Sequence, residues 1–224
     1  TEENAKNYAT TGNINVSGGT ITATGDSGLA QLNDGATKNK FEISGGTFDF
    51  STGAGIYAEG NQGQYNTTAA DIDITGGNFN IKDGGEITLV GKGNLNIGGN
   101  ANITMDYSSE VAGDDLHNGG ILHEGQSGDI NISGGKINLT GEVAKIERGG
   151  YDGDWIYSAT GETLMSEDDF YAKTGKWLGE ATDEDIQKAG LNPAEIDKNQ
   201  YHVSTGDINI SGGEIALNDG ARIS

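Results

Sequence analysis

An alternating apolar and polar phrase, interrupted by a Gly-Gly pair, recurs along most of this chain. It reads NINVSGGTITA near the start, DIDITGGNFNI and DINISGGKINL in the middle, and DINISGGEIAL near the end. The first glycines of the pairs are Gly18, Gly45, Gly76, Gly98, Gly134 and Gly212. Their spacing is irregular and never falls below 22 residues, which is typical of a stacked-repeat protein with insertions at the corners of its repeats.

Each repeat predicts three short β-strands, because apolar and polar residues alternate with period 2 on both sides of the Gly pair. The first strands are predicted at residues 13–16, 41–43, 71–74, 94–97, 129–132 and 207–210. The second strands follow the Gly pair, at 20–23, 47–50, 78–81, 102–105, 136–139 and 214–217. The third strands are less regular and lie around Leu29, Ile56, Ile87, Ile121, Val143 and 221–223. The glycines, which adopt positive φ at little cost, are expected to turn the chain between the first and second strands.

Stacking equivalent strands places the apolar side chains in one column and the polar ones outside. The inward residues of the first strands are Ile14, Ile43, Ile72, Ile74, Leu95, Ile97, Ile130, Ile132, Ile208 and Ile210. We therefore predict an all-β fold, a right-handed parallel β-helix (a three-sheet β-solenoid of about six coils) with a small helical insertion. A Greek-key sandwich is the alternative, but it does not explain why equivalent strands resemble one another.

The repeat disappears between Gly149 and Thr205. We predict one solenoid domain over residues 1–224, with coils at about 11–148 and 206–224, and an extruded, partly helical subdomain at 149–205. Within it, Thr182 is expected to cap a helix that ends at Gly190. A second helix is expected to begin at Asn192 and Pro193 and to run to about residue 199. Ser166, followed by acidic residues, predicts the start of a third.

The composition excludes several functions. The formal net charge of −21 repels phosphate, which excludes nucleic acid as a partner and argues against anionic lipid. No apolar run approaches 18 residues, so no membrane span is predicted. The chain has no Cys, hence no disulfide and no thiolate metal site. No signal peptide is evident and the repeat stops in mid-pattern at Ser224, which predicts a processed product or a piece of a longer protein.

The insertion holds seven of the fifteen aromatic residues of the chain. Aromatic side chains stack on sugar rings and anchor protein interfaces, so we take them as candidate binding residues. These candidates are Tyr151, Trp155, Tyr157, Phe170, Tyr171 and Trp177. The alternative is that they form the small core of the insertion.

Signals for metal binding or catalysis are weak. The stretch DGDWIYSATGE places carboxylates at Asp152 and Asp154, which makes them calcium candidates, but it lacks the Gly and Glu of an EF-hand loop. The three histidines have no metal-ligand spacing. We expect no other cofactor. Asp71 and Asp73 form an outward pair of the kind used in glycoside hydrolysis, yet outward Asp more often protects a sheet surface, so no enzymatic activity is predicted.

The Cys-free, Pro-poor repeats NINVSGGTITA, DIDITGGNFNI and DINISGGKINL resemble passenger regions of bacterial autotransporters and filamentous-haemagglutinin-like adhesins. The resemblance covers residues 11–148 and 206–224. It implies a right-handed parallel β-helix displayed outside the cell, at the surface of the outer membrane. It also implies a role as a stalk or adhesin whose binding regions lie on extruded loops and subdomains.

Three functions remain open on these grounds. The leading hypothesis is a non-enzymatic segment of a bacterial surface or secreted protein. Its β-helix would be a rigid stalk, and its insertion would contact a protein or glycan on a host or neighbouring cell. The second is a filament or surface-layer subunit that self-associates through its coil ends. The third is a polysaccharide-active β-helix enzyme.

Overall fold

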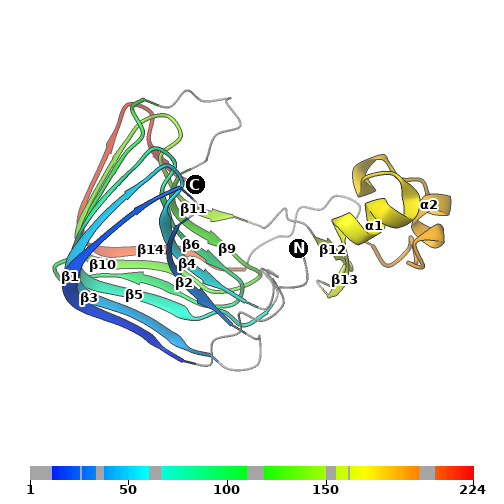
Figure 1. The fold of residues 1–224 in the computed structure, drawn as a ribbon, viewed down its shortest axis with the longest axis horizontal. Helices are drawn as coiled ribbons and strands as arrows, with labels where there is room; N and C mark the ends of the chain where they lie inside the picture. Colours follow the sequence, from blue (N-terminus) through cyan, green and yellow to red (C-terminus); the bar gives the residue numbers. More distant parts are fainter. Residues whose placement is uncertain are drawn as a thin grey trace. The chain divides into compact units, whose positions relative to one another are not determined.

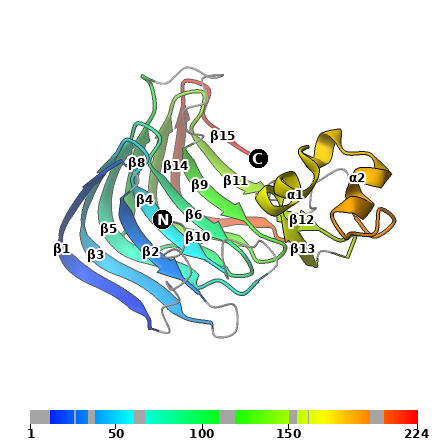
Figure 2. The ribbon, with the colours of Figure 1, turned by 45° about the vertical axis from the view of Figure 1, so that its right-hand side comes forward.

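A computed structural model gives the fold of most of the chain (Figures 1 and 2). It describes residues 12–25, 27–33, 38–60, 67–109, 119–149, 155–160, 162–196 and 205–224. The chain divides into two compact units. Unit 1 comprises residues 1–149 and 204–224, and unit 2 comprises residues 150–203.

The described part of unit 1 consists of two parallel sheets. In sheet order, sheet A contains β1 (Ile14–Thr24), β3 (Lys40–Ser51), β5 (Asp71–Lys82), β7 (Leu95–Ile97), β10 (Ile130–Thr140) and β14 (Ile208–Asn218). Beside β7, β8 (Asn102–Asp106) also lies between β5 and β10. In the same order, sheet B contains β2 (Gly28–Leu32), β4 (Gly55–Glu59), β6 (Glu86–Val90), β9 (Gly120–Glu124), β11 (Lys145–Gly149) and β15 (Arg222–Ile223).

The prediction of a closed three-sheet β-helix is wrong. The segments predicted as separate first and second strands are joined in single strands of 11 or 12 residues, such as β1 and β3, which run through the Gly pair. The pair is a β-bulge: the register between β1 and β3 shifts on both sides of Ser17, and Gly19 has a φ of 89°. A bulge lets a strand continue past glycines at positive φ, so two sheets form where three were expected.

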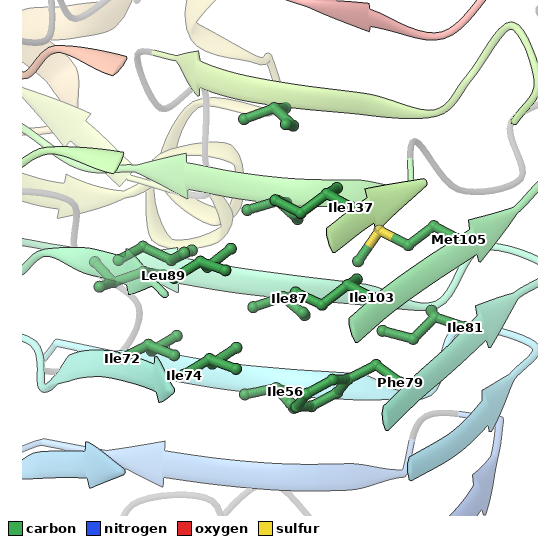
Figure 3. Close-up of a cluster of buried hydrophobic side chains, with 14 of the residues drawn as sticks. Ile56, Ile72, Ile74, Phe79, Ile81, Ile87, Leu89, Ile103, Met105 and Ile137 are labelled. Atoms are coloured by element: carbon green, nitrogen blue, oxygen red, sulfur yellow. The ribbon is translucent and has the colours of Figure 1, made fainter. Parts of the chain in front are cut away.

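The parallel pairing aligns equivalent phrases of the repeat. Ile130 pairs with Leu95 on one side and Ile208 on the other, so apolar residues lie next to apolar residues across the strands. Every strand pair in the described part of unit 1 is parallel, which rules out the Greek-key sandwich. Apolar residues of both sheets form one buried cluster, which includes Ile74 of sheet A and Ile87 of sheet B (Figure 3).

The opposite face of sheet A carries a hydrogen-bonded row of polar side chains. The amide of Asn96 donates to Asp73 Oδ1 (2.6 Å), and the amide of Asn131 donates to Asn96 Oδ1 (2.9 Å). The amide of Asn209 donates in turn to Asn131 Oδ1 (3.0 Å). The row has a direction, because each amide donates to the strand that precedes it in the sheet.

Unit 2 is a small mixed structure with its own core. β12 (Trp155–Tyr157) pairs antiparallel with β13 (Thr163–Ser166), and α1 (Glu167–Thr174), η3 (Leu178–Glu180) and α2 (Asp183–Lys188) follow. The buried hydrophobic cluster that forms this core consists of Ile156, Phe170, Leu178, Ile186, Ala189 and Ile196.

The predicted helix starts at Ser166 and Thr182 are both found. Ser166 Oγ accepts the Asp169 N–H (3.1 Å), and Thr182 forms a capping box with Asp185. The helix predicted from Asn192 is not found: residues 193–195 form a turn, and Ile196 makes an isolated β-bridge with Ser158. That bridge requires extended backbone, which overrides the local helix signal of Pro193. The rest of the predicted helix lies outside the described residues.

Candidate binding site

The predicted aromatic residues of unit 2 separate into buried and exposed groups. Phe170 and Tyr157 are buried, and Phe170 belongs to the core of the unit. Tyr171 and Trp177 remain 45% and 46% exposed. Trp155 lies in β12. Tyr151 and the calcium candidates Asp152 and Asp154 fall outside the described residues.

The two exposed rings, of Tyr171 and Trp177, pack against each other in a tilted arrangement. Their centroids are 4.6 Å apart and their planes are inclined by 30°. We call this the aromatic pair. Each ring therefore has one face against its partner and retains surface open to solvent. The arrangement brings together two residues that are separated by the end of α1.

Local contacts fix the position of Tyr171. Its neighbour Phe170 is fully buried, so α1 is held against the core at this point. The helix ends at Gly175, whose φ of 75° is accessible to glycine at little cost and whose N–H donates to the Tyr171 carbonyl (2.7 Å). Thr174 Oγ1 donates to the Phe170 carbonyl (2.8 Å), which further holds the last turn.

Trp177 is held from both sides along the chain. On one side, Lys176 Nζ donates to Asp185 Oδ2 (2.8 Å), which ties this segment to α2. On the other side, Leu178 is buried in the core. Hydrogen bonds from Lys176 and from Thr182 hold the pKa of Asp185 well below its usual range, so Asp185 stays charged and the tie persists in mild acid.

The aromatic pair suits binding more than reaction. Its rings supply apolar surface, the indole N–H and the phenol O–H supply hydrogen bonds, and a fixed backbone lowers the ordering cost of binding. The first turns of both helices are acidic: Glu167, Asp168 and Asp169 in α1, and Asp183, Glu184 and Asp185 in α2. This charge disfavours anionic ligands.

The outward carboxylates considered for catalysis are tied into the sheet. Asp71 Oδ1 accepts the Asn94 N–H (2.6 Å) and pairs with Lys38 Nζ (2.8 Å). Asp73 accepts the Asn96 amide, and Asp129 Oδ1 accepts the Asp207 N–H (2.9 Å). These contacts explain the carboxylates as links between neighbouring strands.

Sequence reasoning missed a set of partly buried carboxylates on the face of sheet B opposite the core. Burial raises the pKa of Glu59 and of Glu124, and it raises the pKa of Glu86 to about 7, further increased by the charge of Glu124 and opposed by Lys145. Glu86 and Glu124 occupy polar positions of the third strands, which was the available signal. Nothing in the sequence indicated that these positions are partly buried.

The histidines do not form a metal site in the described part of the chain. His123 is fully buried, and its Nε2 lies 2.7 Å from the Gly93 carbonyl, so this nitrogen carries the proton. Burial lowers its pKa to about 4, with a further contribution from Arg148. His117 and His202 lie outside the described residues. Among the described residues, no group of three or more His, Cys, Asp or Glu side chains is placed to hold a metal ion.

Comparisons with protein-family models, curated proteins and solved structures find no match to this chain. No described helix has the length and apolar character needed to cross a membrane.

Proposed function

We propose that this chain is a non-enzymatic binding protein of the bacterial cell surface, with unit 1 as the scaffold and unit 2 as the contact element. The observation that carries the proposal is the aromatic pair, Tyr171 and Trp177. Both rings are exposed, yet the buried Phe170 precedes Tyr171 in the chain and the buried Leu178 follows Trp177, and these two residues anchor the pair to the core. Large aromatic residues with fixed geometry are the residue types that dominate binding energy at interfaces. The resemblance of the repeats to adhesin passengers supports a location outside the cell.

The proposed partner is a protein or neutral glycan on a host or neighbouring cell. The acidic first turns of α1 and α2 favour a neutral or basic contact surface over sialylated or phosphorylated groups. The carboxylates of sheet A, which bond to neighbouring strands, support a scaffold role over hydrolysis.

The test measures attachment of the fluorescently labelled chain to cultured epithelial cells and to bacterial cells. We expect Trp177→Ala and Tyr171→Ala each to weaken attachment about tenfold or more, since removing an anchoring aromatic residue costs about 2 kcal/mol. Gln187→Ala, at an exposed position of α2, is the matched control and should bind like the unchanged chain. Pretreating the cells with protease or with glycosidases distinguishes the two partner classes.

Two results would overturn the proposal. One is equal attachment of all variants, which would show that the aromatic pair does not form the contact. The other is loss of attachment in Gln187→Ala to the same degree as in Trp177→Ala, which would indicate a general disturbance of unit 2. Circular dichroism of each variant checks that the fold is kept.

A further inference from the structure

Carboxylates lie next to both members of the aromatic pair, in each case one turn away along the chain. Asp168 precedes Tyr171 by three residues in α1, and side chains at this spacing are neighbours on a helix surface, with about 5–6 Å between their Cβ atoms. Glu180 follows Trp177 by three residues, and its N–H donates to the Trp177 carbonyl (3.0 Å). Asp168 and Glu180 are both exposed. Negative charge therefore borders the exposed surface of the pair.

The lysines of unit 2 leave this negative charge in excess. The described residues of the unit include nine acidic side chains and three lysines. Lys176 Nζ pairs with Asp185 Oδ2 (2.8 Å), and Lys173 Nζ donates to the Ala189 carbonyl (3.4 Å). The third lysine, Lys188, lies in the last turn of α2. The aromatic pair thus belongs to a unit in which acidic residues outnumber basic ones threefold.

We propose that the aromatic pair binds a cationic side chain, an arginine, presented by a protein partner. The inference rests on the proposed function, in which the pair is the contact element, and it names the chemistry of that partner. The faces of aromatic rings attract cations, and tryptophan does so most strongly. A guanidinium group is planar and weakly hydrated, so it stacks on ring faces while its N–H groups pair with carboxylates. The pair supplies the rings, and Asp168 and Glu180 supply the carboxylates.

The same arrangement fits the other ligands of aromatic rings less well. A sugar hydroxyl both donates and accepts hydrogen bonds, whereas an ionised carboxylate only accepts and a guanidinium only donates. The carboxylates beside the pair therefore match a guanidinium more completely than they match a neutral sugar. Anionic groups are repelled by them. A lysine ammonium has the required charge, but it is more strongly hydrated and has no planar face to lay against a ring.

Tryptophan fluorescence of the full chain tests the inference at the pair itself. Trp155→Phe leaves Trp177 as the one tryptophan, so the signal reports on the pair. The probes are a short peptide of alternating glycine and arginine and two further peptides of equal length, with lysine or citrulline in place of arginine. Citrulline keeps the shape of arginine and lacks its charge. Maltohexaose is the neutral glycan probe.

Two aspartates of α1 supply matched variants in this background. Asp168→Asn and Asp169→Asn each remove one carboxylate from the first turn of the helix, so they change the net charge and the helix end alike. Both positions are exposed. Asp169 precedes Tyr171 by two residues, however, and side chains at that spacing do not face each other. A difference between the variants therefore reports the position of the carboxylate and not the total charge.

We expect the arginine peptide to change Trp177 fluorescence at concentrations at least about ten times lower than the citrulline peptide, and several-fold lower than the lysine peptide. Asp168→Asn should raise the apparent Kd for the arginine peptide about threefold more than Asp169→Asn does, and salt should reduce this difference. Three results would each overturn the inference. They are a citrulline or lysine peptide that equals the arginine peptide, a stronger response to maltohexaose, and equal effects of the two aspartate variants.

The cell-attachment test distinguishes a failure of this inference from a failure of the proposed function. If Trp177→Ala loses attachment while the arginine and citrulline peptides act alike, the pair is the contact element, its ligand is not cationic, and only the present inference fails. If the arginine peptide binds at the pair while all variants attach equally, the pair recognises arginine and the proposed function fails.

Discussion

Units 1 and 2 reach their folded states in different ways. In unit 1 each strand is buried by the strands beside it. Ile132 of β10, which has paired strands on both sides, is 1% exposed, whereas its register partner Ile210 of β14, which is paired on one side in the sheet order, is 49% exposed. Unit 2 has no repeat, and its helices are defined by their own end groups, such as the capping box of Thr182 and Asp185. Its core residues, among them Phe170, are buried by the unit itself. In unit 1 the burial of a side chain therefore depends on whether its strand has neighbours on both sides in the sheet. In unit 2 it depends on how the helices and strands of that unit pack against one another.

The comparison predicts that a charge placed in the core of unit 1, on a strand with neighbours on both sides, has the largest effect on stability. Ile132→Asp should unfold unit 1 or cost about 4 kcal/mol or more, because it buries an unpaired carboxylate between Ile97 and Ile210. Asn131→Asp, one residue away on the opposite face, should cost about 1 kcal/mol through the lost hydrogen bond to Asn96. Urea unfolding measures both, and similar costs would contradict the assignment of faces in β10.

The next effect should be confined to unit 2. Phe170→Ala removes a fully buried side chain from a small core and should cost about 3–5 kcal/mol there. If the units are independent, thermal unfolding followed by tryptophan fluorescence should shift, because both Trp residues belong to unit 2. The β signal of unit 1 in circular dichroism should melt at an unchanged temperature. A common shift of both signals would show that the two units unfold together.

The fold was predictable where the local pattern decides it. The alternation of Ile132 with Asn131 indicated which side chains face the core, and the cap residues Ser166 and Thr182 indicated two helix starts. The Gly pair did not reveal its role, because the same two letters separate β7 from β8 and yet lie inside β1. Whether the Gly pair forms a turn or a bulge depends on how the strand pairs with its neighbours, and the local sequence pattern does not contain that information.

The candidate site was predictable only as a region. The concentration of aromatic residues pointed to unit 2, but the sequence did not say that Phe170 would be buried and its neighbour Tyr171 exposed. Adjacent residues of a helix point in different directions, and which one meets the core depends on the packing of α1 against the rest of the unit. Nor did the sequence place Trp177 on Tyr171, since their contact follows from the turn at Gly175.

A smaller effect is expected from two titratable groups of unit 1, the partly buried Glu86 and the fully buried His123, whose contributions to stability change with pH in opposite directions. The pKa of Glu86 is raised to about 7, chiefly by burial. Between pH 4.5 and 7 the folded state then holds a proton that the unfolded state has lost, so stability from Glu86 falls as pH rises, by roughly 3 kcal/mol in total. The pKa of His123 is lowered to about 4, so its contribution rises by a similar amount from pH 4 to 6.5.

Urea unfolding across this pH range of the unchanged chain, Glu86→Gln and His123→Asn measures the two contributions. The stability of the unchanged chain relative to Glu86→Gln should fall with pH, and its stability relative to His123→Asn should rise. Glu59, Glu124 and Lys145 interact with Glu86 and stay in place in both variants. If both stability differences changed with pH in the same direction, the conclusion that Glu86 and His123 are neutral in the folded protein would be wrong.

The smallest expected effect on unit 1 is that of removing unit 2. The two ends of unit 1 that border the insertion are held by contacts within unit 1 itself. Arg148 donates from Nε to the Gly128 carbonyl (2.7 Å) and from Nη2 to the Gly125 carbonyl (2.8 Å). Where the chain returns, the Thr205 N–H donates to the Gln126 carbonyl (3.0 Å). These bonds do not require residues 150–203.

Replacing residues 150–203 by a short Gly/Ser linker should therefore change the free energy of unfolding of unit 1 by less than about 1 kcal/mol, because closure cost varies slowly with loop length. Arg148→Ala supplies the contrast: it leaves several partly buried carbonyls without a donor and should cost roughly 2–3 kcal/mol with or without unit 2. Chemical denaturation measures the free energy of unfolding of four proteins: the unchanged chain and the Arg148→Ala variant, each with and without unit 2. If the deletion alone unfolds unit 1, unit 2 is a structural brace and the independence of the two units fails. If Arg148→Ala is costly only when unit 2 is present, the guanidinium serves the insertion and not the stack.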